Sequence, residues 1–108
     1  MKVTEIEVHE VMLEYQDFLA YQLNHYYGPA KRVVYVVHTD TGLEGLGESG
    51  RAEPSEVVEE YIGTNPFDWV GDEMSLGLGT AMYDLMGKSV GVPVYKLFGQ
   101  RYRAWVPV

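Results

Sequence analysis

The chain has 108 residues, of which 46% are apolar and 22% charged, and its formal charge is −8. This length allows one domain, and the balance of residue types is that of a folded globular protein. The acidic charge argues against nucleic acid and anionic membrane surfaces as partners. The absence of cysteine excludes disulfides, thiolate metal sites and cysteine nucleophiles. The sequence has neither a signal-peptide core nor a run of about 18 apolar residues, so we expect a cytoplasmic protein.

The first half of the chain has the pattern of strands. Apolar and polar side chains alternate from Val3 to Leu13, with a change of phase that predicts a bulge or a bend near His9 and Glu10. The β-branched run at residues 32–39 is followed by turn residues up to Gly42 and by a further strand at residues 43–48. These features predict a three-stranded antiparallel meander.

The segment between the first two strands, residues 14–30, follows neither the helical nor the strand period. It is rich in tyrosine and ends in Gly28 and Pro29. We expect a long loop with a helical turn around residues 19–23. Loops of this length are uncommon in compact domains and are often functional.

The second half has the pattern of helices. One helix is predicted to begin at Pro54 and to end before Gly63. A second helix should begin between residues 68 and 72 and run to Gly87, with Gly77 and Gly79 indicating close packing against another element. A short helix over residues 95–98 is followed by a stop at Gly99 and by an extended apolar run at residues 105–108. Strands followed by helices predict an α+β fold.

The segments 39–48 and 81–99 carry two motifs that resemble the enolase superfamily, in its mandelate racemase and muconate-lactonizing enzyme branch. The segment 39–48 resembles the family's hairpin, in which a turn with glycine is followed by Gly-x-Gly-Glu. The family's junction between cap and barrel has the pattern Ala-x-x-Asp-Leu, Gly-Lys and Gly-x-Pro-x-x-x-Leu-x-Gly. This chain keeps it at Ala81, Asp84, Leu85, Gly87, Lys88, Gly91, Pro93, Leu97 and Gly99.

The resemblance implies an amino-terminal capping domain, enolase N-terminal-domain-like, at residues 1–99, and a linker with the start of the first barrel strand at residues 100–108. It also implies a (β/α) barrel, in the same chain or as a separate one, and we expect the chain to stop before it. In this family Mg²⁺ on barrel carboxylates stabilises the enediolate formed when a barrel lysine or histidine removes the proton α to a carboxylate. The full enzyme would be a dehydratase (a lyase), a racemase or a cycloisomerase (isomerases). The chain alone would lack catalytic residues and bind no metal.

Two segments, residues 15–29 and residues 49–54, are candidates for contacts with a carboxylate-bearing substrate, because cap loops of such enzymes close over the active site. Guanidinium and hydroxyl groups can bond a carboxylate while aromatic rings exclude water. The alternative for the aromatic residues is that they pin the loop to the sheet or form a contact within a homo-oligomer. The candidate substrate-binding residues are Tyr21, His25, Tyr26, Tyr27 and Arg51.

The remaining titratable residues are interpreted as structural. Glu44 and Glu48 share a strand face without forming a converging cluster, so a solvated or hydrogen-bonded role is expected and not a metal site. Asp84 and Lys88 lie one helical turn apart and are expected to pair. The alternative to a capping domain is a stand-alone, non-catalytic α+β module that binds a partner protein.

Overall fold

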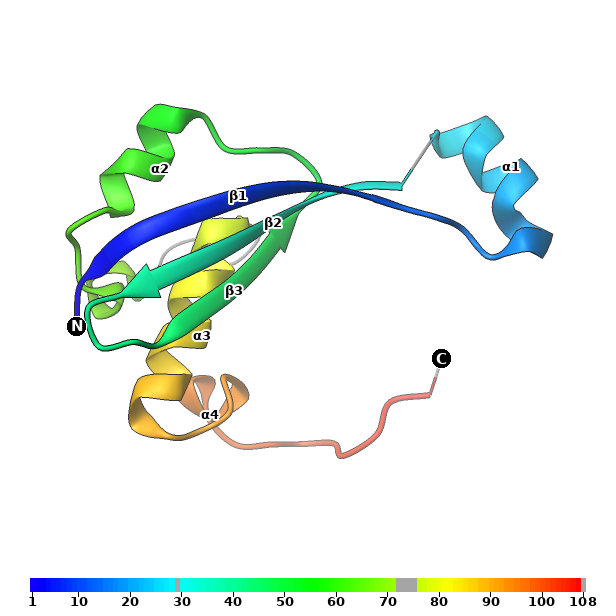
Figure 1. Cartoon of the computed structure of the whole chain (residues 1–108). Helices are drawn as coiled ribbons and strands as arrows, with labels where there is room; N and C mark the ends of the chain where they lie inside the picture. Colours follow the sequence, from blue (N-terminus) through cyan, green and yellow to red (C-terminus); the bar gives the residue numbers. More distant parts are fainter. Residues whose placement is uncertain (29, 72–75, 108) are drawn as a thin grey trace.

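The computed structural model describes residues 1–28, 30–71 and 76–107. Three strands form one antiparallel sheet in the order β1-β2-β3, and the helices follow in the second half of the chain (Figure 1). The predicted α+β meander is therefore confirmed. The elements are β1 (Val3–Leu13), α1 (Asp17–Tyr27), β2 (Ala30–Thr39), β3 (Glu44–Ser49), α2 (Ser55–Tyr61), the 3-10 helix η1 (Pro66–Trp69), α3 (Gly77–Val90) and α4 (Tyr95–Phe98).

The strand β1 differs from its prediction in the position of the irregularity. The register between β1 and β2 shifts between Val3 and Glu5, and from there to Leu13 the pairing is continuous, so the bulge predicted near His9 and Glu10 is wrong. The apolar pattern changes phase along β1 because the distal half of this strand is exposed. Beyond Ile6 no residue of β1 is buried, so no core holds the apolar residues of this half to one face.

The connection between β1 and β2 is a helix and not the predicted long loop. α1 spans 11 residues and stands beyond the end of the sheet, on a ribbon formed by the distal halves of β1 and β2 (Figure 1). Its acidic residue Asp17 lies in the first turn, where it interacts favourably with the helix dipole. The helix has no buried face among its described side chains, and for that reason its sequence lacks an amphipathic period.

Of the two longer helices predicted in the second half, the first agrees with its prediction at both ends and the second differs at both ends. α2 begins just after Pro54, and Gly63 follows its end with a left-handed φ of 83°. The second helix was predicted to start at residues 68–72, but this region contains η1, and α3 begins only at Gly77. α3 also continues past the predicted end at Gly87, to Gly91, whose left-handed backbone ends it. Residue 72, the last position of the predicted start, lies outside the described residues.

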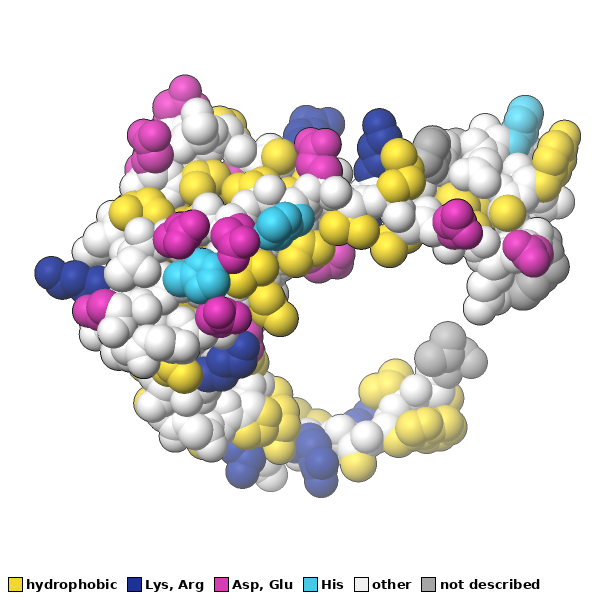
Figure 2. Space-filling model, in the orientation of Figure 1, with side chains coloured by type: hydrophobic (Ala, Val, Ile, Leu, Met, Phe, Trp, Pro, Cys, Tyr) yellow, Lys and Arg dark blue, Asp and Glu magenta, His cyan; other side chains and the backbone are white. Residues whose placement is uncertain are grey.

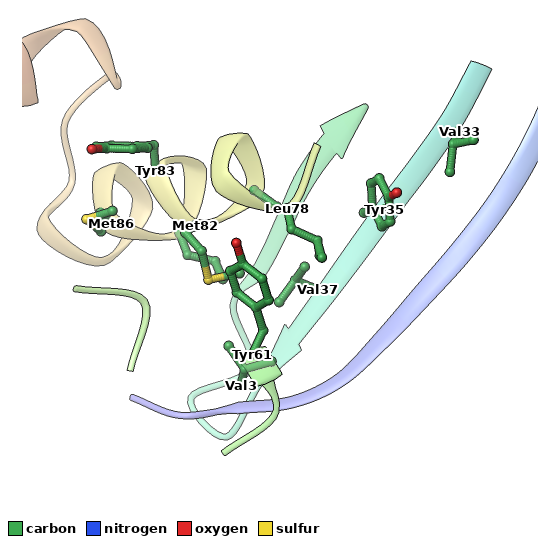
Figure 3. Packing of buried hydrophobic residues seen from close by; sticks show 11 residues of the cluster. Val3, Val33, Tyr35, Val37, Tyr61, Leu78, Met82, Tyr83 and Met86 are labelled. Atoms are coloured by element: carbon green, nitrogen blue, oxygen red, sulfur yellow. The ribbon is translucent and has the colours of Figure 1, made fainter. Parts of the chain in front are cut away.

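The core lies between α3 and the inner face of β2 and β3 (Figure 3). Tyr35 and Val37 from β2 pack with Leu78, Met82 and Leu85 of α3, and all five are fully buried. The close approach predicted from Gly77 is present: a Cβ atom on Gly77 would lie 2.4 Å from the Tyr35 ring. The described part of the chain contains no helix that is long and apolar enough to cross a membrane.

The free edge of β3 is covered by polar side chains from α3. A carboxylate oxygen of Asp84 accepts a hydrogen bond from the main-chain N–H of Leu46, with an N···O distance of 2.8 Å. Lys88 Nζ donates to the carbonyl of Glu44 at 2.7 Å and to Asp84 at 2.8 Å, which confirms the predicted Asp84–Lys88 pair. The pair thus satisfies backbone groups that an exposed edge strand would offer to another chain.

The C-terminal part of the chain leaves the body after α4. The short helix predicted at residues 95–98 is confirmed, and Gly99 follows it with a φ of 134°. Residues 100–107 form neither helix nor strand, and Trp105 is 77% exposed. The predicted extended run ends at Val108, which lies outside the described residues.

Candidate functional site

A groove of about 520 Å³ lies where the distal halves of β1 and β2 meet the loop after β3. Residues 10–12 line it from β1, residues 31–33 from β2, and residues 50–52 from the loop. Because β1 and β2 are antiparallel, Glu10 pairs with Val33 and Met12 with Lys31, which brings these four residues to the same place. We call this the Arg51 groove, after the predicted site residue that lines it.

The loop that carries Arg51 is tied to the core. The hydroxyl of Tyr35, which is fully buried, accepts a hydrogen bond from the main-chain N–H of Glu53 at 2.8 Å. Ser49 Oγ donates to the carbonyl of Arg51 at 2.8 Å. Side chains of the sheet therefore hold the carbonyl of Arg51 and the main-chain N–H of Glu53.

The three cations in the Arg51 groove differ in their partners. Arg32 makes two hydrogen bonds of 2.9 Å to the carboxylate of Glu48, from Nε and from Nη2. These hydrogen bonds raise the pKa of Arg32 and lower that of Glu48. Lys31 and Arg51 form no ion pair with any residue in the described ranges, so their charges are available to an anionic ligand.

The aromatic candidates lie elsewhere, on α1. Tyr21 is 81% exposed, and its ring stacks on that of His25 with the centroids 6.2 Å apart. Tyr26 and Tyr27 belong to α1, but their side chains lie outside the described residues. The structure therefore brings Tyr21 and His25 together and does not bring them into the Arg51 groove. A substrate-binding role for these residues stays a prediction.

The base of α1 is closed by a hydrogen bond across its ends. Tyr15 donates its hydroxyl proton to the carbonyl of Gly28, at an O···O distance of 3.2 Å. A second groove, of about 410 Å³, lies at this base and contains the carboxylates of Glu14 and Asp17. Its acidic lining makes it a poorer site for a carboxylate than the Arg51 groove.

Lys31 and Glu10 line the Arg51 groove but were not predicted from the sequence. They are 21 positions apart in the chain and meet only through the register of β1 with β2. Lys31 is recognised as a groove residue only by its pairing with Met12, near the start of the second strand. That position follows from the register and not from any local motif.

Acidic and histidine side chains are the possible metal ligands of this cysteine-free chain. The described residues include no group of three or more His, Asp or Glu side chains that could hold a metal ion. Glu44 and Glu48 bind different partners, since Glu48 pairs with Arg32 and Glu44 contacts His38. Glu48 thus has the hydrogen-bonded role that was expected, and Glu44 has an ion-pair contact.

Solved structures with the same fold are known, although no family model and no curated protein matches the chain. A predicted mandelate racemase/muconate-lactonizing enzyme from Roseovarius nubinhibens, complexed with magnesium, superimposes with a TM-score of 0.73 at 25% identity. This match covers all of the present chain and 35% of the other. An enolase from Streptomyces coelicolor, predicted to be a sugar isomerase, gives a TM-score of 0.71 at 26% identity and covers 95% and 33% of the two chains.

A third matched structure is that of an enzyme whose name states its reaction. The dipeptide epimerase from Enterococcus faecalis V583, complexed with Mg and the dipeptide L-Leu-L-Tyr, gives a TM-score of 0.68 at 23% identity. This match covers 92% of the present chain and 35% of the epimerase. The chain therefore spans about a third of the length of the solved structures that it matches, which are epimerases, isomerases and predicted racemases.

Proposed function

We propose that this chain, which has the fold of the amino-terminal domain of the enolase superfamily, is the capping and specificity part of an enzyme that removes a proton α to a carboxylate. In this proposal the chain contacts the substrate and closes the site, while a barrel, in the same chain or in a separate one, carries out the proton transfer. The reaction would be that of a racemase, a dehydratase or a cycloisomerase.

The observation that carries the proposal is the pair of uncommitted cations in the Arg51 groove. Lys31 and Arg51 are two unpaired cations in a groove whose lining includes one carboxylate, that of Glu10. Val11, Met12 and Ala52 form its apolar lining, in a protein whose formal charge is −8. A guanidinium can bind a carboxylate through two parallel hydrogen bonds, and apolar walls reduce competition from water. An anionic small molecule is the ligand that this groove fits.

Mg²⁺ is the metal expected for the full enzyme, since two of the matched structures are magnesium complexes. Mg²⁺ requires several oxygen ligands in octahedral geometry. The described residues of this chain do not supply them. In our proposal the metal ligands and the base therefore belong to the barrel, and no proton transfer is assigned to this chain.

The α1 residues have a second role in this proposal. They belong to α1, which stands beyond the sheet on the same side as the C-terminal segment (Figure 1). The residues are Tyr21, His25, Tyr26 and Tyr27. A barrel bound between α1 and the C-terminal segment would place its substrate opposite these side chains. Exposed apolar residues at Met12, Leu13 and Trp105, which are 59%, 52% and 77% exposed, support a protein partner on this side.

The proposed carboxylate site can be tested by NMR. Backbone amide shifts would be followed while small hydroxy-acids are titrated into the isotope-labelled chain, with the corresponding neutral amides as ligand controls. We expect the acids to shift residues 10–12, 31–33 and 50–52, and Arg51→Gln to weaken this response several-fold. Arg103→Gln is the matched control variant, because it removes one positive charge from the exposed C-terminal segment.

Two results would contradict the proposed site. One is a response to the acids that is unchanged in Arg51→Gln, and the other is an equal response to the neutral amides. In the stand-alone interaction module that is the alternative function, the same groove residues would contact a partner protein and would not distinguish acids from amides.

A further inference from the structure

The outer face of the sheet, which α3 does not cover, carries a cluster of acidic and histidine side chains that the proposed function does not use. Figure 2 shows this face, with carboxylates gathered around histidines near the hairpin end of the sheet. His38 lies at the centre of the cluster, on β2. Glu7 contacts it from β1 and Glu44 from β3.

The contacts of His38 involve both of its ring nitrogens. Nε2 lies 2.5 Å from Oε2 of Glu7, and Nδ1 lies 3.3 Å from Oε1 of Glu44. An ionised carboxylate only accepts hydrogen bonds, and a neutral imidazole donates from only one nitrogen. The contact with Glu7 is a hydrogen bond, and the contact with Glu44 is an ion-pair contact. The charged ring is therefore attracted by both carboxylates, whereas a neutral ring keeps only the hydrogen bond to Glu7.

From this geometry we propose that His38 is a proton-dependent clamp that joins all three strands of the sheet, strong when the imidazole is charged and weakened when it loses its proton. The clamp is distinct from the Arg51 groove and does not depend on the proposed function. It would make the free energy of unfolding of this domain sensitive to pH near neutrality, and with it the pairing of β1 and β3 with β2.

The surrounding charges support the clamp. Glu5 and Glu7 on β1 and Glu44 on β3 would repel one another without a cation between them. His9 Nε2 lies 3.4 Å from the other oxygen of Glu7, and the Lys88 ammonium bonds the main-chain carbonyl of Glu44 at 2.7 Å. The side chain of His38 is only 28% exposed, so water screens its contacts less than it would on an open surface.

The direction of the pH effect follows from the same contacts. The hydrogen bond to Glu7, together with the charges of Glu44, Glu7 and Glu5, raises the pKa of His38 above its ordinary value of 6.5. A raised pKa in the folded state adds stability that is complete below pH 6.5 and is lost as the pH rises through the folded pKa. The pKa of Glu7 is lowered, chiefly by the hydrogen bond with His38, so its contribution is present above pH 4.5 and is lost in acid.

The clamp can be tested on the 108-residue chain by two measurements. The first is an NMR titration of the ring protons of His38, assigned with a His38→Gln variant and repeated in Glu7→Gln. We expect the midpoint to lie above that of the same residue in the urea-unfolded chain, and to move back toward it in Glu7→Gln. The second is the thermal midpoint Tm between pH 6 and pH 9, compared between the wild type and His38→Gln.

The clamp predicts that the wild type loses Tm as the pH rises over this range and that His38→Gln lacks this part of the loss. His9→Gln is the matched control, because it removes a histidine that contacts only one of the two carboxylates, and it should keep most of the wild-type slope. A His38 midpoint at or below that of the unfolded chain would overturn the proposal, even if the variants fail to fold. Parallel Tm profiles of the wild type and His38→Gln would do the same.

Discussion

Two glycines of β3 set the distance between α3 and the sheet. A Cβ atom on Gly47 would lie 1.8 Å from the carbonyl oxygen of Gly77, and one on Gly45 would lie 2.5 Å from that of Ala81. Both contacts are to helix backbone, which cannot move aside in the way that a flexible side chain can. The Gly-x-Gly of the hairpin is therefore explained by helix packing and not by turn conformation.

We predict that Gly47→Ala destabilises the chain by about 3 kcal/mol, because α3 must shift away from β3 and disturb the core around Tyr35. Urea unfolding followed by circular dichroism would measure this change. Gly50→Ala is the matched control, since the nearest atom to its added methyl group is the end of the Arg32 side chain, at 3.3 Å. A change within about 0.5 kcal/mol is expected for the control. Equal effects of the two variants would contradict this account.

Only part of the candidate site could be predicted from the sequence. Arg51 was predicted because it follows the third strand, and the structure places it in a groove with apolar walls. Lys31 and Glu10 were missed because only the β1–β2 register brings them there. The partners of His38 were missed for the same reason: Glu7 and Glu44 are far apart in the chain and share one sheet face.

Among the elements, the contact between α3 and the edge of β3 depends on one side chain. Asp84 accepts a hydrogen bond from the Leu46 N–H and also pairs with Lys88, while its own side chain is 27% exposed. We predict that Asp84→Ala lowers the free energy of unfolding by about 1 to 2 kcal/mol, since it removes a charge-assisted hydrogen bond and leaves the N–H to water. Denaturant unfolding would measure the loss.

The variant Asp84→Asn separates the two interactions. Its amide oxygen can still accept from Leu46, but its ion pair with Lys88 is lost, so we expect a cost of only a few tenths of a kcal/mol. If Asp84→Asn is as destabilising as Asp84→Ala, the ion pair dominates and the proposed role of the hydrogen bond is wrong. Asp84→Ala should also increase self-association, because it exposes the β3 edge.

Elements that pack on the core were the ones that the sequence predicted. The strands β2 and β3 and the body of α3 have a buried face, and burial produces the period that reveals them. α1 has no such face among its described side chains, so a helix was mistaken for a loop. The bulge was misplaced on β1 for a related reason, since the distal half of this strand is exposed and its apolar phase carries no information about packing.

At the scale of the whole molecule, apolar side chains are exposed on both projecting parts, which are α1 with the distal halves of β1 and β2, and the C-terminal segment after α4. Short isolated helices of about 12 residues are marginally stable in water, and α1 has 11 residues without a described buried face. Tyr102 and Trp105 in the C-terminal segment are 90% and 77% exposed. In our proposal a barrel covers both projecting parts.

The claim that this chain contacts the substrate but transfers no proton is tested most directly by solvent exchange. The purified chain would be incubated in D₂O with Mg²⁺ and a panel of hydroxy-acids and dipeptides, and deuterium at the α-carbon would be measured by NMR. The dipeptide epimerase from Enterococcus faecalis, with L-Leu-L-Tyr, serves as the positive control. We predict no exchange above the rate without protein, and Mg²⁺-dependent exchange that EDTA abolishes would contradict our account.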